Sequence, residues 1–374
     1  MNRHLPEVAA VFFKLGCIAF GGPAAHVAMM EKEIIEKRQW MSREHFLDLM
    51  GATNLIPGPN STEMTMHCGY ERAGWPGLFV AGICFIFPAV VLTGFLAALY
   101  VQYGTLPAVQ PFIYGIKPAV LAIILGAVIK LGKKALKNNE LGIIGTLTLL
   151  ASLAGLSEVI ALLAAGVLGM MYFILKNRIP TPLPSFAPWI ILQMGSLWSI
   201  KIPSLKIALI FLKVGAILYG SGYVLFAYLD AELVATGLLS RQELIDAIAV
   251  GQFTPGPVLS TSTFIGYQLN GFAGAVAATV GIFLPSFLFV LLLNPWIPKM
   301  RQSKWLSYFL DAVNIAAVAV MVSVLWSMGR AVLVNWPAIL ILLLSLLANF
   351  QLKLGSVWIV LGGAILGALL QSFV

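Results

Sequence analysis

The motif Pro-Gly-Pro occurs twice in this chain, each time inside an apolar segment and close to small hydroxyl residues. The first copy, Pro57-Gly58-Pro59, precedes Asn60-Ser61-Thr62, and the second, Pro255-Gly256-Pro257, is followed by Ser260 and Thr261. Proline interrupts a helix because it lacks a backbone N–H, whereas a proline next to hydroxyl residues suits a helix start. Helix N-termini bind anions through free N–H groups and the helix dipole. The two motifs therefore predict one anion site built from two helix N-termini.

A glycine turn precedes each motif in the chain. Phe20-Gly21-Gly22-Pro23 has its counterpart in Tyr219-Gly220-Ser221-Gly222. Glycine permits unusual dihedral angles and close backbone approach, although small residues also serve tight helix packing in membranes. Because both turns occupy the same place in a repeat, we predict that Gly21, Gly22, Gly220 and Ser221 face the ligand.

Two lysines lie inside apolar runs, shortly before these turns. Ionisable residues in membrane segments are costly and usually face a cavity or a partner, although a lysine near a helix end can also extend to the interface. Lys14 and Lys213 hold equivalent places, so together they could neutralise one dianion. Lys117 and its repeat partner Asn314 form a weaker polar pair of the same kind.

Glu63 and His67 are four residues apart on the helix that follows the first motif, so they share one face. A carboxyl beside an imidazole that titrates near neutral pH could relay protons, although an ordinary structural role explains the pair equally well. A metal site needs three or four protein ligands, and only His26 could join them. We therefore predict no metal and no cofactor.

Composition places the chain in a membrane. The 374 residues are 60% hydrophobic and 10% charged, whereas soluble domains contain about 25% charged residues. Several apolar runs approach the ~20 residues that cross a bilayer. The net charge of +8 is typical of basic loops on the cytoplasmic side, and no basic stretch carries the interleaved aromatics expected of nucleic-acid binding. The sequence predicts an all-α polytopic membrane protein of the cell inner membrane, surrounded by lipid.

An internal repeat divides the chain into two homologous halves. Lys14 and Lys213 are 199 residues apart, Pro57 and Pro255 are 198 apart, and Pro88 and Pro285 are 197 apart. We predict an N-terminal repeat over 1–178, a proline-rich linker over 179–199 and a C-terminal repeat over 200–374. Matching breaks in two halves are the best sequence indication of a transport site.

The basic loops predict that the halves are inverted-topology repeats with broken, re-entrant helices at the Pro-Gly-Pro motifs. If Lys130–Lys137 lies in the cytoplasm, the positive-inside rule favours re-entrance near Pro255, because Lys299, Arg301 and Lys304 then lie inside. This arrangement has a helix over 204–228 crossing to the outside and an external N-terminus. Parallel repeats are the alternative.

The same stretches resemble the chromate ion transporter family. They are Phe20-Gly21-Gly22-Pro23 with His26, Trp40 with Phe46, the run from Leu55 to Glu63, Gly69-Tyr70 through Gly77, Phe87-Pro88, and Phe253-Thr254-Pro255-Gly256-Pro257. The resemblance covers nearly the whole chain. It implies a two-domain carrier that exports chromate and has been linked with sulfate, so the site would take a divalent tetrahedral oxyanion.

We therefore predict a secondary transporter that exports chromate or a sulfate-like oxyanion, and not an enzyme. A P-loop of the GxxxxGK[ST] kind is absent from the sequence, so ATP is not the direct energy source. An anion channel with the same helix ends and a membrane-embedded chromate-converting enzyme remain as alternatives. A homodimer is an open alternative to a monomer.

Overall fold

The computed structural model describes residues 4–20, 22–53, 56–177, 203–219, 222–293 and 303–370. In these residues the regular structure is helical and no strand occurs. The first half contains α1 (Leu5–Ile18), α2 (Pro23–Met30), the π-helical η1 (Glu31–Lys37), α3 (Arg43–Thr53), α4 (Asn60–Tyr103), α5 (Gln110–Ala135), α6 (Asn139–Leu153) and α7 (Glu158–Lys176). The second half contains α9 (Pro203–Ile217), η3 (Gly222–Val224), α10 (Leu225–Leu229), the π-helical η4 (Asp230–Val234), α11 (Arg241–Phe253), η5 (Val258–Ser260), α12 (Thr261–Leu293), α14 (Lys304–Val332), α15 (Trp336–Phe350) and α16 (Ser356–Leu369).

The longest helix of each half is a helical hairpin. Ala73 and Gly74 break the helical geometry of α4, and Asn270 and Gly271 break that of α12. A β-carbon on Gly69 would lie 2.5 Å from Cβ of Ala81, which a continuous helix would hold about 18 Å away. Each helix therefore consists of a short arm (60–72 or 261–269) folded back on a long arm (75–103 or 272–293).

The first helix of each half also doubles back. Lys14 of α1 pairs with Glu33 of η1, and Lys213 of α9 pairs with Glu232 of η4. The predicted helix over 204–228 is therefore wrong, since α9 ends at Ile217 and the chain returns along it. The physical reason is the glycine turn, which ends the helix before it can cross.

The two long arms run in opposite directions. Phe79, near the start of the first arm, stacks on Phe287, near the end of the second, with ring centroids 5.7 Å apart. Further along the first arm, Tyr100 contacts Phe264 of the second half's short arm, which is folded onto the start of the second long arm. This arrangement agrees with the predicted inverted repeats, while their placement in a bilayer stays a prediction.

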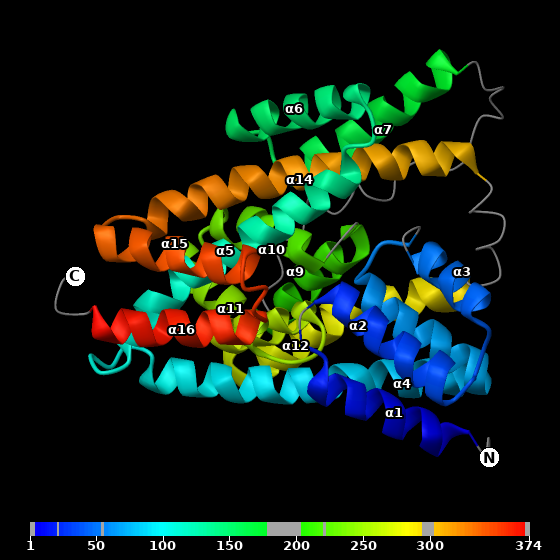
Figure 1. Ribbon diagram of the computed structural model, residues 1–374, viewed down its shortest axis with the longest axis horizontal. Helices are drawn as coiled ribbons and strands as arrows, with labels where there is room; N and C mark the ends of the chain where they lie inside the picture. Colours follow the sequence, from blue (N-terminus) through cyan, green and yellow to red (C-terminus); the bar gives the residue numbers. More distant parts are fainter. Residues whose placement is uncertain are drawn as a thin grey trace.

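The sequence predicts an external N-terminus on the side opposite the basic loop Lys130–Lys137, and this relative placement is wrong. Arg72, at the fold of the α4 hairpin, donates to Glu7 near the start of α1 at 2.8 Å. From that fold the long arm of α4 passes to the opposite end of the molecule and α5 returns (Figure 1). The N-terminal end of α1 and Lys130–Lys137 therefore lie on the same side, which also satisfies the positive-inside rule.

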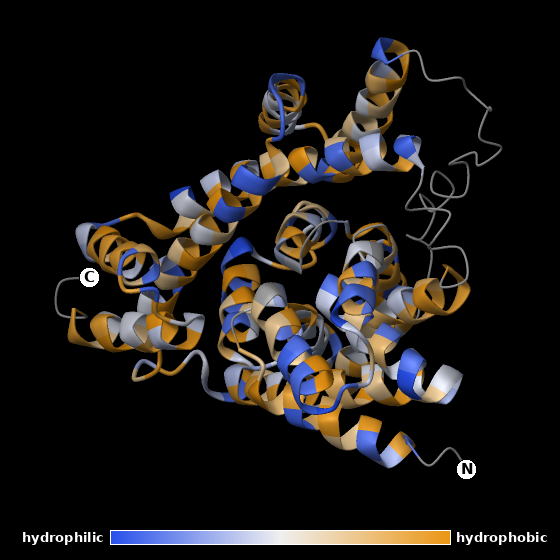
Figure 2. Ribbon diagram, turned by 45° about the vertical axis from the view of Figure 1, so that its right-hand side comes forward, coloured by the Kyte–Doolittle hydropathy of each residue, from blue (hydrophilic) through white to orange (hydrophobic). Residues whose placement is uncertain are grey.

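The remaining helices pack mainly on one another. α14 packs on α5, α6 and α7, while α15 and α16 pack on α5. Five helices of the described residues are long and apolar enough to cross a membrane, and hydrophobic residues run along them in Figure 2. Large apolar side chains such as Leu175 and Trp358 are exposed, as expected for a surface that faces lipid.

Candidate functional site

The Pro-Gly-Pro loop of each half docks on the glycine turn of the other half. Gly58 N–H donates to the carbonyl oxygen of Leu218 at 2.6 Å, and Gly256 N–H donates to that of Ala19 at 2.8 Å. Ala19 and Leu218 are the residues just before the two glycine turns. Both glycines have positive φ, at 142° and 88°, which disfavours any other residue. Four predicted chain breaks therefore meet at one junction between the halves.

Both short arms begin at this junction. The helix of α4 starts at Asn60 directly after Pro59, while α12 starts at Thr261 after a 3-10 turn that follows Pro257. The predicted hydroxyl residues Ser61, Thr62, Ser260 and Thr261 are all buried. The structure therefore brings the predicted helix starts of the two halves together, with their first-turn N–H groups at the centre of the protein.

Several buried polar atoms at the junction have no hydrogen-bond partner among the described residues. They include Oγ1 of Thr62, Oγ of Ser260 and Oγ of Ser286, a residue of the α12 long arm that sequence analysis missed. An unpaired buried hydroxyl costs ~1–3 kcal/mol, so such groups are usually kept for a ligand or water. By contrast, Thr261 and Ser262 bond back to the carbonyls of Val258 and Leu259.

Glu63 is the most unusual residue of the junction. Its side chain is fully buried, and neither carboxyl oxygen has a hydrogen bond or ion pair among the described residues. The carboxyl lies against Gly58, which also faces Ser286 of the other half. His67 is buried one helical turn further along. The predicted pair therefore lies beside the Pro-Gly-Pro loop.

His26 joins the glycine turn of the first half to the start of α4. Its Nε2 donates to the carbonyl of Ala19 at 3.0 Å, the same oxygen that accepts from Gly256, and its Nδ1 lies 3.2 Å from Oγ of Ser61. From the sequence, His26 was a candidate only for a metal site and for the family resemblance. The sequence did hold a sign that His26 lies at the junction, because it follows the proline of the glycine turn by three residues.

The polar cluster belongs to the first half. In the second half the positions equivalent to His26, Ser61, Glu63 and His67 hold Leu225, Leu259, Thr261 and Ile265. Leu225, Leu259 and Ile265 are fully buried. The junction is therefore symmetric in its backbone and asymmetric in its side-chain chemistry.

Both predicted lysines form ion pairs that sequence analysis missed. Lys14 Nζ lies 2.9 Å from Glu33, and Lys213 Nζ lies 2.6 Å from Glu232. The signal was present, because each glutamate follows its lysine by 19 residues in both halves. Each lysine thus already has a carboxylate partner, and its contact with a substrate stays a prediction.

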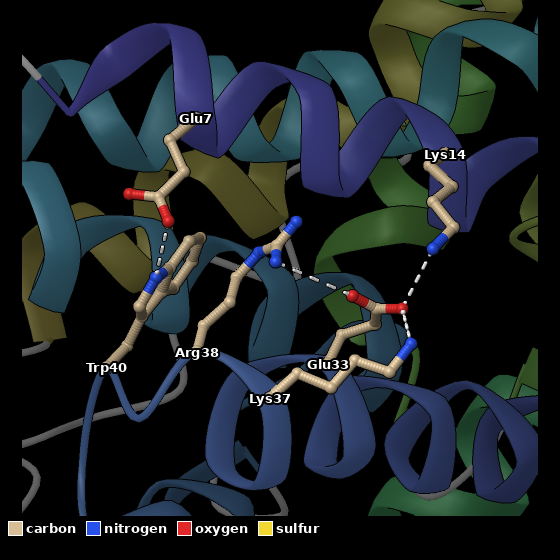
Figure 3. Close-up of polar contacts among 6 residues, drawn as sticks. All are labelled: Glu7, Lys14, Glu33, Lys37, Arg38 and Trp40. Atoms are coloured by element: carbon tan, nitrogen blue, oxygen red, sulfur yellow. Dashed lines mark hydrogen bonds and ion pairs between the residues drawn. The ribbon is translucent and has the colours of Figure 1, made fainter.

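The first of these pairs is part of a larger basic cluster. Lys37 and Arg38 also converge on Glu33, at 2.8 and 3.9 Å (Figure 3). The hydrogen bonds from Lys37 and Lys14 lower the pKa of Glu33 to about 2. Three cations therefore share one carboxylate, whereas the equivalent positions 236 and 237 of the second half hold Thr236 and Gly237.

Comparison with known proteins places these features in a family. The sequence profile named chromate transporter matches residues 6–170 and, a second time, residues 205–368. The chain belongs to the chromate transporter family. The double match also confirms the two homologous halves.

Curated relatives support this membership. The chain is 30% identical over 383 residues to a probable chromate transport protein of Synechococcus elongatus, covering 98% of this chain and 96% of the relative. It is 31% identical over 378 residues to a chromate transport protein of Cupriavidus metallidurans, covering 97% and 92%. No solved structure matches the chain. The predictions of a multi-pass membrane protein and of a transporter instead of an enzyme are confirmed.

Some predicted residues of this transporter lie outside the described residues. They are Gly21, Gly220, Ser221 and the linker over 179–199. Gly22 is described and has a φ of 80° at the start of α2. In the described ranges, no group of three or more His, Cys, Asp or Glu side chains is placed to hold a metal ion.

Proposed function

We propose that this protein is a secondary carrier that exports chromate, or a related divalent oxyanion such as sulfate, across the cytoplasmic membrane. The observation that carries the proposal is the junction, where each Pro-Gly-Pro loop docks on the glycine turn of the opposite half. Two helix N-termini at the centre of a membrane protein favour a negatively charged ligand. The choice of chromate as the substrate rests on the names of the family relatives.

The proposed binding groups are N–H and hydroxyl donors. A tetrahedral oxyanion would accept from the backbone N–H groups at the starts of α4 and η5 and from the hydroxyls of Thr62, Ser260 and Ser286. Such donors fix an anion without bringing a strongly hydrated cation into the protein. Lys14 and Lys213 would contribute at longer range, or after leaving their glutamates.

Glu63 adds a proton to this proposal. A buried, unpaired carboxylate would repel a dianion and is itself costly, so we propose that Glu63 carries a proton while the anion is bound. His67, on the same face, would pass that proton to or from water. Because the second half has Thr261 and Ile265 at these positions, proton transfer would occur on one side of the junction only.

The membrane potential supports export. Moving one charge across 100 mV is worth about 2.3 kcal/mol, so a potential that is negative inside drives a dianion outward. The basic cluster of Lys14, Lys37 and Arg38 lies on the same side as Lys130–Lys137, which the positive-inside rule assigns to the cytoplasm. It would attract oxyanions to the side from which they are exported.

Transport by purified protein in proteoliposomes tests the proposal. Labelled chromate, sulfate, molybdate and phosphate are offered with and without an imposed potential and a pH gradient. We expect saturable transport of chromate or sulfate, stimulated by anion on the far side, with chromate recovered unreduced. Transport of none of these dianions would refute the proposal, non-saturable flux would indicate a channel, and recovery of reduced chromium would indicate an enzyme.

A further inference from the structure

Two helices that are equivalent in the repeat have different surroundings. Positions 46 and 49 of α3 are buried, as are their counterparts 244 and 247 of α11. The neighbouring face differs, since Leu47 is 45% exposed whereas its counterpart Ile245 is 0% exposed. Asp48 is exposed, and its counterpart Asp246 is buried. The same helix face is therefore open in the first half and covered in the second.

A polar cluster holds the covered face of α11. Asp246 accepts a hydrogen bond of 2.6 Å from Tyr100 and forms an ion pair of 3.3 Å with Lys117 of α5. Lys117 also donates to Gln242, which itself donates to the carbonyl of Ala331. A cavity of about 220 Å³ beside the cluster is lined by α4, α5, α11 and α16. These contacts join α11 to helices of both halves.

The open face of α3 is suited to water and not to lipid. Glu44 and Asp48 are exposed on it, one turn apart, and carboxylates avoid the hydrocarbon region. The equivalent of the Lys117–Asp246 pair would join Asn314 of α14 to Asp48. Asp246 is buried against Lys117 and Tyr100, whereas Asp48 is exposed.

A second pair of equivalent contacts shows the same asymmetry. Phe309 of α14 packs edge-to-face on Tyr219, with ring centroids 6.1 Å apart. Their counterparts in the first half, Phe112 and Phe20, are 46% and 42% exposed. Both α5 and α14 thus contact elements of the second half, α11 and Tyr219, and leave the equivalent surfaces of the first half open.

We infer that the structure is one end state of an alternating cycle, in which Tyr100, Lys117 and Asp246 form a closed gate. The open gate is the face of α3 with Asp48, on the side of Lys130–Lys137, and it closes when Asp48 meets Asn314. In the other end state, each half has the packing that its counterpart has in this structure, because the two repeats are equivalent. This inference rests on the proposed carrier function.

Labelling of single cysteines tests the gates without any transported anion. Cys17, Cys68 and Cys84 are first replaced, and Leu47→Cys or Ile245→Cys is introduced. In membranes open on both sides, a water-soluble maleimide should modify position 47 rapidly and position 245 slowly. Adding Asp246→Asn should raise modification at position 245 several-fold and lower it at position 47, because it weakens the closed gate.

A matched control and a cross-link complete the experiment. Asp311→Asn breaks another ion pair between the two halves, from α14 to Lys137 in the loop between α5 and α6, and should change neither rate. Oxidation of a Lys117→Cys/Asp246→Cys pair should stop transport until a reductant is added, and an Asp48→Cys/Asn314→Cys pair should cross-link during turnover.

Three results would overturn the gates. The first is that Asp246→Asn leaves the rates of maleimide modification at positions 47 and 245 unchanged. The second is that it raises the rate at both positions, which would indicate loosening of the fold. The third is that Asp48→Cys and Asn314→Cys fail to cross-link. Failure of chromate transport alone would refute the proposed substrate and leave the labelling result intact.

Discussion

Replacing Gly58 by alanine tests the junction directly. Gly58 has a φ of 142°, and a β-carbon there would lie 2.7 Å from Oγ of Ser286 and collide with Oε1 of Glu63. The dihedral strain is worth ~1–3 kcal/mol, and overpacking adds ~1–3 kcal/mol. The sum of about 2–6 kcal/mol would destabilise the contact that joins the two halves. We expect Gly58→Ala to lose at least tenfold in transport rate, since 1.4 kcal/mol corresponds to about tenfold.

Gly155 provides the matched control. It also has positive φ, 93°, but a β-carbon there meets nothing within 4 Å. Gly155→Ala should therefore carry the ~1–3 kcal/mol of strain without the collision, so its melting temperature in detergent should fall while its transport rate is retained. The two variants separate loss of the junction from a general loss of stability.

The assay is chromate or sulfate flux in proteoliposomes, with melting temperature measured on the same preparations. Gly58→Ala/Ser286→Ala should regain part of the melting temperature, because it removes the hydroxyl oxygen at 2.7 Å, but not the flux, because that hydroxyl is one of the proposed anion donors. Equal flux in Gly58→Ala and Gly155→Ala would refute the reasoning, as would a melting temperature of Gly58→Ala that the second substitution does not raise.

Three further predictions concern charged residues. Glu63→Gln mimics the protonated acid, so transport should persist but should no longer respond to a pH gradient; an unchanged response would remove Glu63 from proton transfer. Glu33→Gln removes the carboxylate that three cations share, so the apparent KM for the anion should fall at low ionic strength and return to the wild-type value in high salt. A KM that does not change with salt would argue against recruitment of the anion by the basic cluster. Because the pKa of Glu33 is lowered to about 2 from 4.5, its stabilising effect is present above pH 4.5 and is lost as the pH falls towards 2. The difference in melting temperature between wild type and Glu33→Gln should shrink over that interval, and a constant difference would contradict the lowered pKa.

The sequence allowed the local breaks of the chain to be predicted. Proline and glycine act through their own backbone chemistry, so Pro57–Pro59, Pro255–Pro257 and the two glycine turns were recognisable without the fold. The duplication identified two halves and, with the basic loops, predicted their inverted relation. Buried hydroxyls after each motif were predicted for the same local reason.

The contacts between distant segments could not be predicted in this way. The docking of Gly58 on Leu218 joins residues 160 positions apart, and no local pattern encodes it. Ser286 was missed because a serine in an apolar arm is unremarkable until its neighbour is known. The hairpin fold at Gly74 and Gly271 did leave a signal in the repeated small residues, and the repeated Lys–Glu spacing signalled the ion pairs.

If the proposed dianion binds at the junction, the asymmetry of the side chains there has a physical reason. If Glu63 had an acidic counterpart at position 261, two carboxyl groups would flank one doubly charged ligand, and both would have to stay protonated for it to bind. Thr261, which bonds back to Val258, removes that demand while keeping the helix start. In the proposed cycle the backbone would remain symmetric, so that the halves could exchange packing between α3 and α11, while a single acid on the first half would link the anion to a proton.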